Sequence, residues 1–171
     1  IASVEDVAGG LASALPHVLT SGGDSRHASL HRTLMPSYTD LPVRAQQSLK
    51  VLAVLPAGVT ADGARSLLAQ PDPLAAGDVE LLTRVSLLSF DGLRYRMLEP
   101  IRQFALSMIE PADWQQVIDQ HVRHWVGWSK AIGVGVTTDD SSNSFAALAT
   151  EQANVEAAMR MMLGHGATDA A

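Results

Sequence analysis

The sequence predicts a mainly helical fold with one β-hairpin, and three observations lead to this prediction. Apolar residues recur at helical spacing over most of the chain, as at Leu49, Leu52 and Ala53. One short stretch alternates between apolar and polar residues instead, and the Asp91-Gly92 pair inside it is a strong hairpin signal. The composition, 47% hydrophobic and 18% charged, is typical of a globular protein that buries a core.

The composition also excludes several kinds of site. The 171-residue chain has no cysteine, which rules out disulfides, thiolate zinc sites and cysteine nucleophiles. A formal net charge of -6 disfavours nucleic-acid binding, which depends on neutralising phosphates. The apolar runs are too short to span a bilayer, and the first residues lack the features of a signal peptide. We expect a cytoplasmic location without membrane contact, and a start at Ile1 inside an apparent helix suggests an excised fragment.

Several helices are expected before the hairpin, from apolar spacing and from the residues at their ends. They cover residues 3–15, 30–41, 44–55, 61–69 and 78–85. Pro36 predicts a kink or a late start in the second of these, because proline removes a backbone donor. Thr60 and Asp78 are predicted to cap the last two.

The hairpin is expected to join strands at 86–90 and 93–98. In the returning strand, Tyr95 and Met97 should face the core while Arg94 and Arg96 face outward. The period becomes helical at residue 99. A carboxylate there favours a helix N-terminus and can pair with an arginine one turn on, at position 102.

The last third of the chain is expected to be purely helical. Asp113 with Gln116 can form a capping box, and a broad apolar stripe follows. A polar loop is predicted over 133–144. The stripe of the final helix is predicted at Phe145, Leu148, Val155, Met159 and Met162.

Helices followed by one β-hairpin make the winged-helix pattern, which suggests a domain organisation. Residues 1–25 would end an upstream helical segment and loop. Residues 26–110 would form a winged-helix domain. Residues 111–171 would form an α-helical arm, either a helical linker or the start of TPR-like repeats. A fold of this kind does not by itself settle function.

Several stretches, in this order, resemble one family. They are Arg26 to Leu30, Ser37-Tyr38, Leu41-Pro42, 49–56 with Gly58, Leu81-Leu82, Ser86 to Leu88, Arg94 to Ala105, His121 with Trp125, and Glu151 with 154–158. The segment from Arg94 to Ala105 carries the strongest similarity. Together they resemble the winged-helix and helical-linker region of bacterial STAND (NB-ARC-like) ATPase transcriptional regulators, such as antibiotic-pathway regulatory proteins and large LuxR-type regulators. The resemblance covers most of the chain.

The resemblance implies a non-catalytic regulatory segment that works as a latch. In such proteins a P-loop ATPase domain comes first and sensor repeats follow the winged helix. This chain has no Gly-x-x-x-x-Gly-Lys-Ser/Thr loop, so ATP or ADP is expected in an upstream domain and no cofactor here. The implied partners are that nucleotide domain and the downstream repeats. The candidate inter-domain contacts are Arg26, His27, Arg96, Glu99 and Arg102.

One position departs from the family pattern. Plant and animal relatives have Met-His-Asp at the junction of strand and helix, and their histidine touches the bound diphosphate. This chain has Met97-Leu98-Glu99 there. Because a leucine side chain neither donates hydrogen bonds nor carries charge, we expect no nucleotide contact from Leu98.

A DNA-binding winged-helix module is the alternative function. Arg94 and Arg96 would project from the wing, where such proteins often touch phosphates. The helix that would enter the groove offers Asp78, Glu80 and Arg84, a poor surface for a polyanion. We therefore expect no DNA binding by this chain, and the arginines would lie on a solvated face or pair with a neighbouring domain.

An enzyme or metal protein is the third possibility. His27 and His31 have a metal-binding spacing on a helix, but no acidic or thiol partner is near them. His121 and His124 are three apart with Asp119 close by, but His121 falls on the apolar stripe. We expect His27 and His31 on the surface, His121 packed in the core, and no constellation that catalyses a reaction. Trp128 falls off the main apolar stripe and is expected to face a partner.

Overall fold

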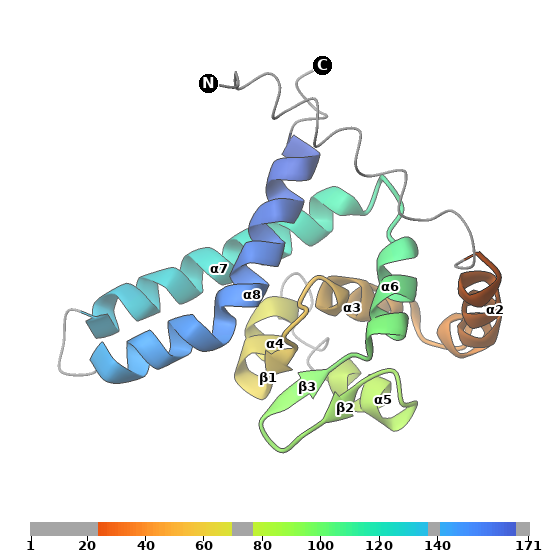
Figure 1. Ribbon diagram of the computed structural model, residues 1–171, viewed down its shortest axis with the longest axis horizontal. Coiled ribbons are helices and arrows are strands. Elements are labelled where there is room, and N and C mark those ends of the chain that lie inside the picture. Colours follow the sequence, from red (N-terminus) through yellow and green to blue (C-terminus); the bar gives the residue numbers. More distant parts are fainter. Residues whose placement is uncertain (1–23, 70–76, 137–140, 167–171) are drawn as a thin grey trace. The chain divides into compact units, whose positions relative to one another are not determined.

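The computed structural model describes residues 24–69, 77–136 and 141–166. The chain divides into two compact units, residues 1–36 and residues 37–171. The described part is mainly helical and contains a small three-stranded antiparallel sheet, so the coarse fold class is confirmed (Figure 1). The helix predicted over 3–15 lies outside the described residues. Within the described ranges, no helix is long and apolar enough to cross a membrane.

Helix α2 spans Asp24–Thr39 and contains Pro36. The predicted late start at this proline is wrong, and the helix continues for three residues beyond it. Proline removes one backbone donor, that of its own nitrogen, and the helix continues despite this loss. Tyr38 in the last turn is buried, and its ring packs edge to face on Phe104 at a centroid distance of 5.6 Å.

Four short helices enclose the apolar core of the second unit. They are α3 (Val43–Ala53), α4 (Ala61–Leu68), α5 (Asp78–Arg84) and α6 (Glu99–Ser107). Their buried residues include Ala45, Leu49, Leu52, Ala53, Ala64, Leu67, Leu68, Val79, Leu82, Ile101, Phe104 and Ala105. The helical spacing of Leu49, Leu52 and Ala53 therefore marks the buried face of α3. Thr60 caps α4 as predicted, because its side-chain oxygen accepts from the backbone N–H of Gly63 at 3.1 Å.

Asp78 does not cap α5, which is a correction to the sequence prediction. The N-cap residue is Gly77, and the Asp78 side chain is buried with 1% of its surface exposed. Its carboxylate pairs with Arg44 of α3 at 2.9 Å and accepts from the Ser48 hydroxyl at 2.8 Å. A carboxylate that can reach a cation and a hydroxyl across the core is more stable there than at an exposed cap. The outward charges of α5 are then Glu80 and Arg84.

The sheet consists of β1 (Val59–Thr60), β2 (Ser89–Phe90) and β3 (Arg94–Arg96), in the order β1-β3-β2. Strand β1 was not predicted, since two residues are too few to show a period. The hairpin strands are shorter than predicted. In the register, Val59 faces Tyr95 on one side of β3, and Phe90 faces Tyr95 on the other.

Gly58 allows β1 to approach β3 this closely. Its φ is +69°, in the left-handed region, and a Cβ at this position would lie 2.3 Å from the carbonyl oxygen of Tyr95. Any side chain would therefore clash with the backbone of the central strand. The turn after α3 therefore requires a glycine at position 58.

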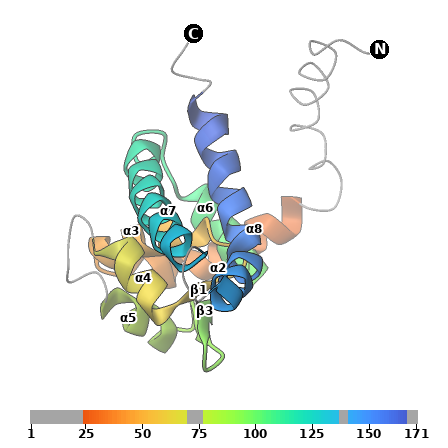
Figure 2. The same cartoon turned by 90° about the vertical axis from the view of Figure 1, so that its left-hand side faces the viewer.

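The arm consists of two long helices, α7 (Trp114–Val136) and α8 (Ser141–Gly166), which pack against each other (Figures 1 and 2), and the second half of α8 crosses α7 in Figure 1. The loop predicted over 133–144 is wrong for 133–136 and 141–144, which are helical. The predicted capping role of Asp113 gives way to an ion pair, because its carboxylate lies 2.6 Å from Lys50 Nζ on α3. This pair joins the start of the arm to the helical core.

The buried face of α8 differs from the predicted stripe. Phe145 and Met159 are 60% and 55% exposed, whereas Asn154 and Ala158 are fully buried. The predicted stripe is therefore wrong at Phe145, Leu148 and Met159, whereas Val155 and Met162 are half-buried. A polar residue is stable on the buried side because the loop after α3 and the hairpin supply hydrogen-bond partners for it.

Candidate functional site

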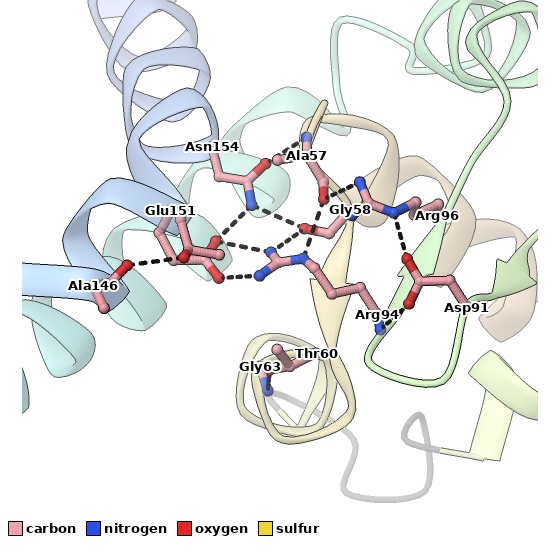
Figure 3. Close-up of polar contacts among 11 residues, drawn as sticks. Ala57, Gly58, Thr60, Gly63, Asp91, Arg94, Arg96, Ala146, Glu151 and Asn154 are labelled. Carbon is pink, nitrogen blue, oxygen red and sulfur yellow. Dashed lines mark hydrogen bonds and ion pairs between the residues drawn. The ribbon is translucent and has the colours of Figure 1, made fainter. Parts of the chain in front are cut away.

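A buried polar cluster joins the hairpin to the arm. We call it the clasp: the side chains of Arg94 on β3 and of Glu151 and Asn154 on α8, with the backbone of Ala57 and Gly58 between them (Figure 3). The two parts that it connects are far apart in the sequence.

Arg94 forms the centre of the clasp. Its guanidinium donates to both carboxylate oxygens of Glu151, from Nη1 at 2.7 Å and from Nη2 at 3.0 Å. It also donates from Nε to the carbonyl of Ala57 at 3.1 Å and from Nη2 to that of Gly58 at 2.7 Å. The side chains of the ion pair are 8% and 15% exposed, for Arg94 and Glu151 respectively. This geometry is bidentate and largely shielded from water, which makes charge-assisted hydrogen bonds strong.

Asn154 completes the clasp from one turn further along α8. Its amide nitrogen donates to Glu151 Oε2 at 2.6 Å and to the carbonyl of Gly58 at 2.8 Å. Its amide oxygen accepts from the backbone N–H of Ala57 at 2.9 Å. Because Asn154 is fully buried, these bonds replace those that it would make to water. The amide thus fastens α8 to the turn that follows α3.

The position of Arg94 corrects the prediction that it projects outward from the wing. The residue is 6% exposed and belongs to the central strand of the sheet. Alternation predicts which residues share a face, but it does not show that α8 covers the face of Arg94. The paired carboxylate of Glu151 is what makes burial of this charge tolerable.

Arg96 forms a second ion pair at the edge of the hairpin. Its Nε lies 2.7 Å from Asp91 Oδ2, and its Nη1 donates to the carbonyl of Ala57 at 3.1 Å. Asp91 also accepts from the backbone N–H groups of Leu93 and Arg94. The bond from Arg96, followed by these two backbone bonds, holds the pKa of the Asp91 carboxyl well below its usual range. Arg96 remains half exposed, with 51% of its side chain accessible.

Glu99 and Arg102 pair within the first turn of α6, as the sequence suggested. Arg102 donates from Nε and Nη2 to the two carboxylate oxygens of Glu99, at 2.7 and 2.8 Å. Hydrogen bonds from Arg102 and then Gln103 lower the pKa of the Glu99 carboxyl. Arg102 also donates to the carbonyl of Ala53 at 3.3 Å, so it ties α6 to the end of α3. Glu99 is the more exposed partner.

The remaining candidate residues lie elsewhere. Arg26 and His27 belong to α2, and their side chains lie outside the described residues. His31 is exposed, as expected. The described residues contain no group of three or more His, Asp or Glu side chains placed to hold a metal ion.

His121 is packed in the core, as predicted. It is fully buried, and its Nε2 lies 3.0 Å from the carbonyl oxygen of Val51. A carbonyl oxygen only accepts, so Nε2 carries the proton and donates. Burial lowers the pKa of His121 to about 4, because desolvation disfavours the imidazolium. The ring is therefore neutral at pH 7 and stabilises the contact between α7 and α3.

The structure thus brings together a cluster that the sequence did not predict. The candidates Arg96, Glu99 and Arg102 make short-range ion pairs, while Arg94, Glu151 and Asn154 form the long-range clasp. One signal was present in the sequence: Glu151 and Asn154 are three apart, so they lie on one side of a helix. No family model, curated protein or solved structure matches this chain.

Proposed function

We propose that this chain is a non-catalytic regulatory segment: a winged-helix domain with a helical arm, acting as a latch between domains of a STAND-type ATPase regulator. The resemblance of Arg94 to Ala105 and of Glu151 to Ala158 to that family supports the assignment. The observation that carries the latch mechanism is the clasp. A cytoplasmic location is part of this proposal.

The clasp supports a mechanical role because it makes the hairpin and α8 move together. Separating them would leave Arg94 and Glu151 without their counter-charges in a mostly dry site, which costs several kcal/mol, on the order of 3–5. A force on the arm therefore displaces the hairpin. In the proposed resting state the winged helix docks on an upstream nucleotide domain, and input through downstream repeats changes that docking. The two states must differ in their contacts for the input to have an effect.

The half-exposed ion pairs beside the hairpin are the proposed docking contacts. Arg96 and Glu99 expose about half of their side chains or more. Arg102 orients Glu99, while Arg26 and His27 are proposed from the resemblance alone. Neither ATP nor ADP is assigned to this chain, and the proposed partners are the nucleotide domain and the repeats.

Nucleotide release tests the latch. In the natural protein that carries the ATPase domain, the release rate of a fluorescent ADP analogue would be measured for Arg96→Ala, Glu99→Ala and Glu151→Gln. We expect all three to change the rate. Arg65→Ala removes an exposed ion pair with Asp62 at 2.6 Å and is the matched control. Unchanged release in all three variants, with intact folding, would contradict the latch, as would the absence of a phosphate-binding loop before this segment.

DNA binding is the less favoured function because the wing arginines are already engaged. Arg94 is enclosed by the clasp, and Arg96 is paired with Asp91. The tip of the wing exposes apolar residues instead, among them Phe90 and Leu93. A mobility-shift assay over a salt series distinguishes the two functions. Tight binding that weakens steeply with salt would overturn our preference.

A further inference from the structure

The chain contains two Asp-Gly pairs, Asp62-Gly63 and Asp91-Gly92, and the structure places them in different surroundings. The first pair lies in the first turn of α4, and the second lies at the exposed tip of the hairpin. An aspartate that precedes a glycine can rearrange without an enzyme, because no side chain shields the glycine nitrogen. The same dipeptide therefore occurs once in a helix and once in a turn, and the two surroundings can be compared directly.

The rearrangement proceeds through a five-membered ring. The backbone nitrogen of the glycine attacks the side-chain carboxyl carbon of the aspartate and loses its proton as the C–N bond forms. The hydroxyl of the neutral carboxyl leaves with that proton as water, which gives a succinimide. Water then opens the ring at either carbonyl and yields aspartate or isoaspartate, with no net change in mass. Because a hydroxyl leaves only from the neutral acid, an ionised carboxylate reacts slowly.

The hairpin tip leaves the glycine nitrogen open to this reaction. Asp91, Gly92 and Leu93 are all exposed. Apart from the two chain neighbours of Gly92, no heavy atom lies within 4 Å of the position where its Cβ would stand. Within the described part of the chain, its N–H donates no backbone hydrogen bond. Neither packing nor a hydrogen bond of the glycine therefore opposes ring closure here.

Arg96 holds the Asp91 carboxyl in its unreactive form (Figure 3). Its Nε donates to Oδ2 at 2.7 Å, while the backbone N–H groups of Leu93 and Arg94 donate to Oδ1 at 3.0 and 2.8 Å. These donors, with Arg96 first, hold the pKa of the Asp91 carboxyl well below its usual range. Ring closure removes one of the two carboxyl oxygens, so it must break at least one of these contacts.

The helix protects the pair in α4 by a different means. The Gly63 N–H donates to Thr60 Oγ1 at 3.1 Å, and a Cβ on this glycine would lie 2.9 Å from Val59 Cγ2. Ring closure there would break the cap and distort the first turn of α4. The ion pair of Asp62 with Arg65 has side chains 89% and 63% exposed, so it should contribute little to this protection.

From these observations we propose that Asp91 is a site of spontaneous isomerisation to isoaspartate, and that Arg96 restrains the reaction by binding the Asp91 carboxylate. The product has one extra carbon in the main chain of the hairpin tip. Its free carboxylate is one carbon shorter, which disrupts the contacts to Arg96 and to the backbone of Arg94. The site thus allows a slow covalent change beside the clasp. It goes beyond the latch and does not depend on it.

Mass-spectrometric peptide mapping of the full 171-residue chain measures isoaspartate at both positions, with electron-transfer fragmentation to distinguish it from aspartate. Incubation for several weeks at about pH 6 is suitable, because the neutral fraction then rises about tenfold for each unit by which the pKa returns toward about 3.9. We expect isoaspartate at position 91 to form about tenfold faster in Arg96→Ala than in the wild type. Equal rates in the two proteins, or no isoaspartate at position 91 in Arg96→Ala, would overturn the proposal.

Three comparisons separate the effect of Arg96 from a general loosening of the fold. In Arg96→Ala, isoaspartate at position 62 should stay at the wild-type level, and a joint rise at both positions would attribute the reaction to unfolding instead. Arg96→Lys keeps a cation beside Asp91 and should resemble the wild type more than Arg96→Ala does; equal rates in Lys and Ala would contradict protection by charge. Arg65→Ala removes the matching ion pair of Asp62 and should leave position 62 unreactive. A tenfold rise there would contradict protection by the helix.

Discussion

Removal of the Glu151 carboxylate is the sharpest test of the clasp. Glu151→Ala deletes the counter-charge of Arg94 and an acceptor of the Asn154 amide, while the backbone carbonyls of Ala57 and Gly58 stay in place. The guanidinium is then left with two neutral acceptors in a site where its side chain is only 8% exposed. Because a buried charge without a counter-charge is unstable, we expect Glu151→Ala to lower the free energy of unfolding by about 3–5 kcal/mol.

A double variant shows whether the two charges stabilise each other, by comparison with the two single variants. Replacing both charges, as Arg94→Met with Glu151→Met, removes the uncompensated charge as well as the attraction. Two backbone acceptors keep partners in this variant, since Asn154 still donates to the carbonyl of Gly58 and Arg96 to that of Ala57. We therefore expect the double variant to be more stable than the sum of the single variants predicts, with a coupling energy of about 2–3 kcal/mol.

The coupling energy is measured by urea unfolding of four proteins: the wild type, the two single methionine variants and the double variant. The midpoint and the slope must both be fitted, because a changed slope signals a changed denatured state. Arg65→Ala is the control. Its ion pair with Asp62 has side chains 63% and 89% exposed, and such pairs contribute about 0–1 kcal/mol. A coupling energy below about 0.5 kcal/mol between Arg94 and Glu151 would refute the reasoning, since the clasp would then be no stronger than an exposed pair.

The other predictions concern stability at single positions. The folded-state pKa of His121 is about 4, below its unfolded value of 6.5. The contribution of the neutral ring to the free energy of unfolding is therefore complete above pH 6.5. It is lost as the pH falls toward 4, by about 3 kcal/mol in all. Urea midpoints measured against pH should show this loss in the wild type and a smaller one in His121→Gln; parallel curves would contradict it. Gly58→Ala should destabilise by more than about 2 kcal/mol and by more than Gly92→Ala, because both have positive φ but only the first would clash with β3; equal thermal shifts would count against the clash. Thr60→Ala should cost about 1 kcal/mol through the lost cap of α4, whereas Thr60→Ser should cost less; similar melting temperatures for Ala and Ser would argue that the cap contributes little.

The elements that the sequence predicted well are those with a strong local signal. Helix α3 follows from the spacing of Leu49 and Leu52 and ends before Pro56, and α4 begins at its Thr60 cap. The hairpin turn follows from Asp91-Gly92, and Gly92 has the positive φ that such turns favour. The two loop residues are Gly92 and Leu93 rather than Asp91 and Gly92, because Asp91 is hydrogen-bonded to Arg94. These features depend on residues within one or two turns of one another.

The errors lie where a distant partner decides the outcome. Asp78 looks like a helix cap until Arg44, 34 positions away, pairs with it across the core. In α8 the apolar residues Phe145 and Met159 mark a plausible inner face, yet Asn154 lies on the buried side. Neither outcome has a local signal, because both depend on which polar groups meet after the helices have packed.

The sequence by itself determined that the chain is mainly helical with one hairpin, because periodicity, caps and turn residues act over a few positions. Only the tertiary structure decided that Arg94 lies buried against Glu151, 57 positions further along, and that β1 joins the sheet beside it. Burial of a charge depends on the three-dimensional surroundings, since the same arginine is stable in water or opposite a carboxylate. The clasp therefore arises from the packing of α8 against the hairpin.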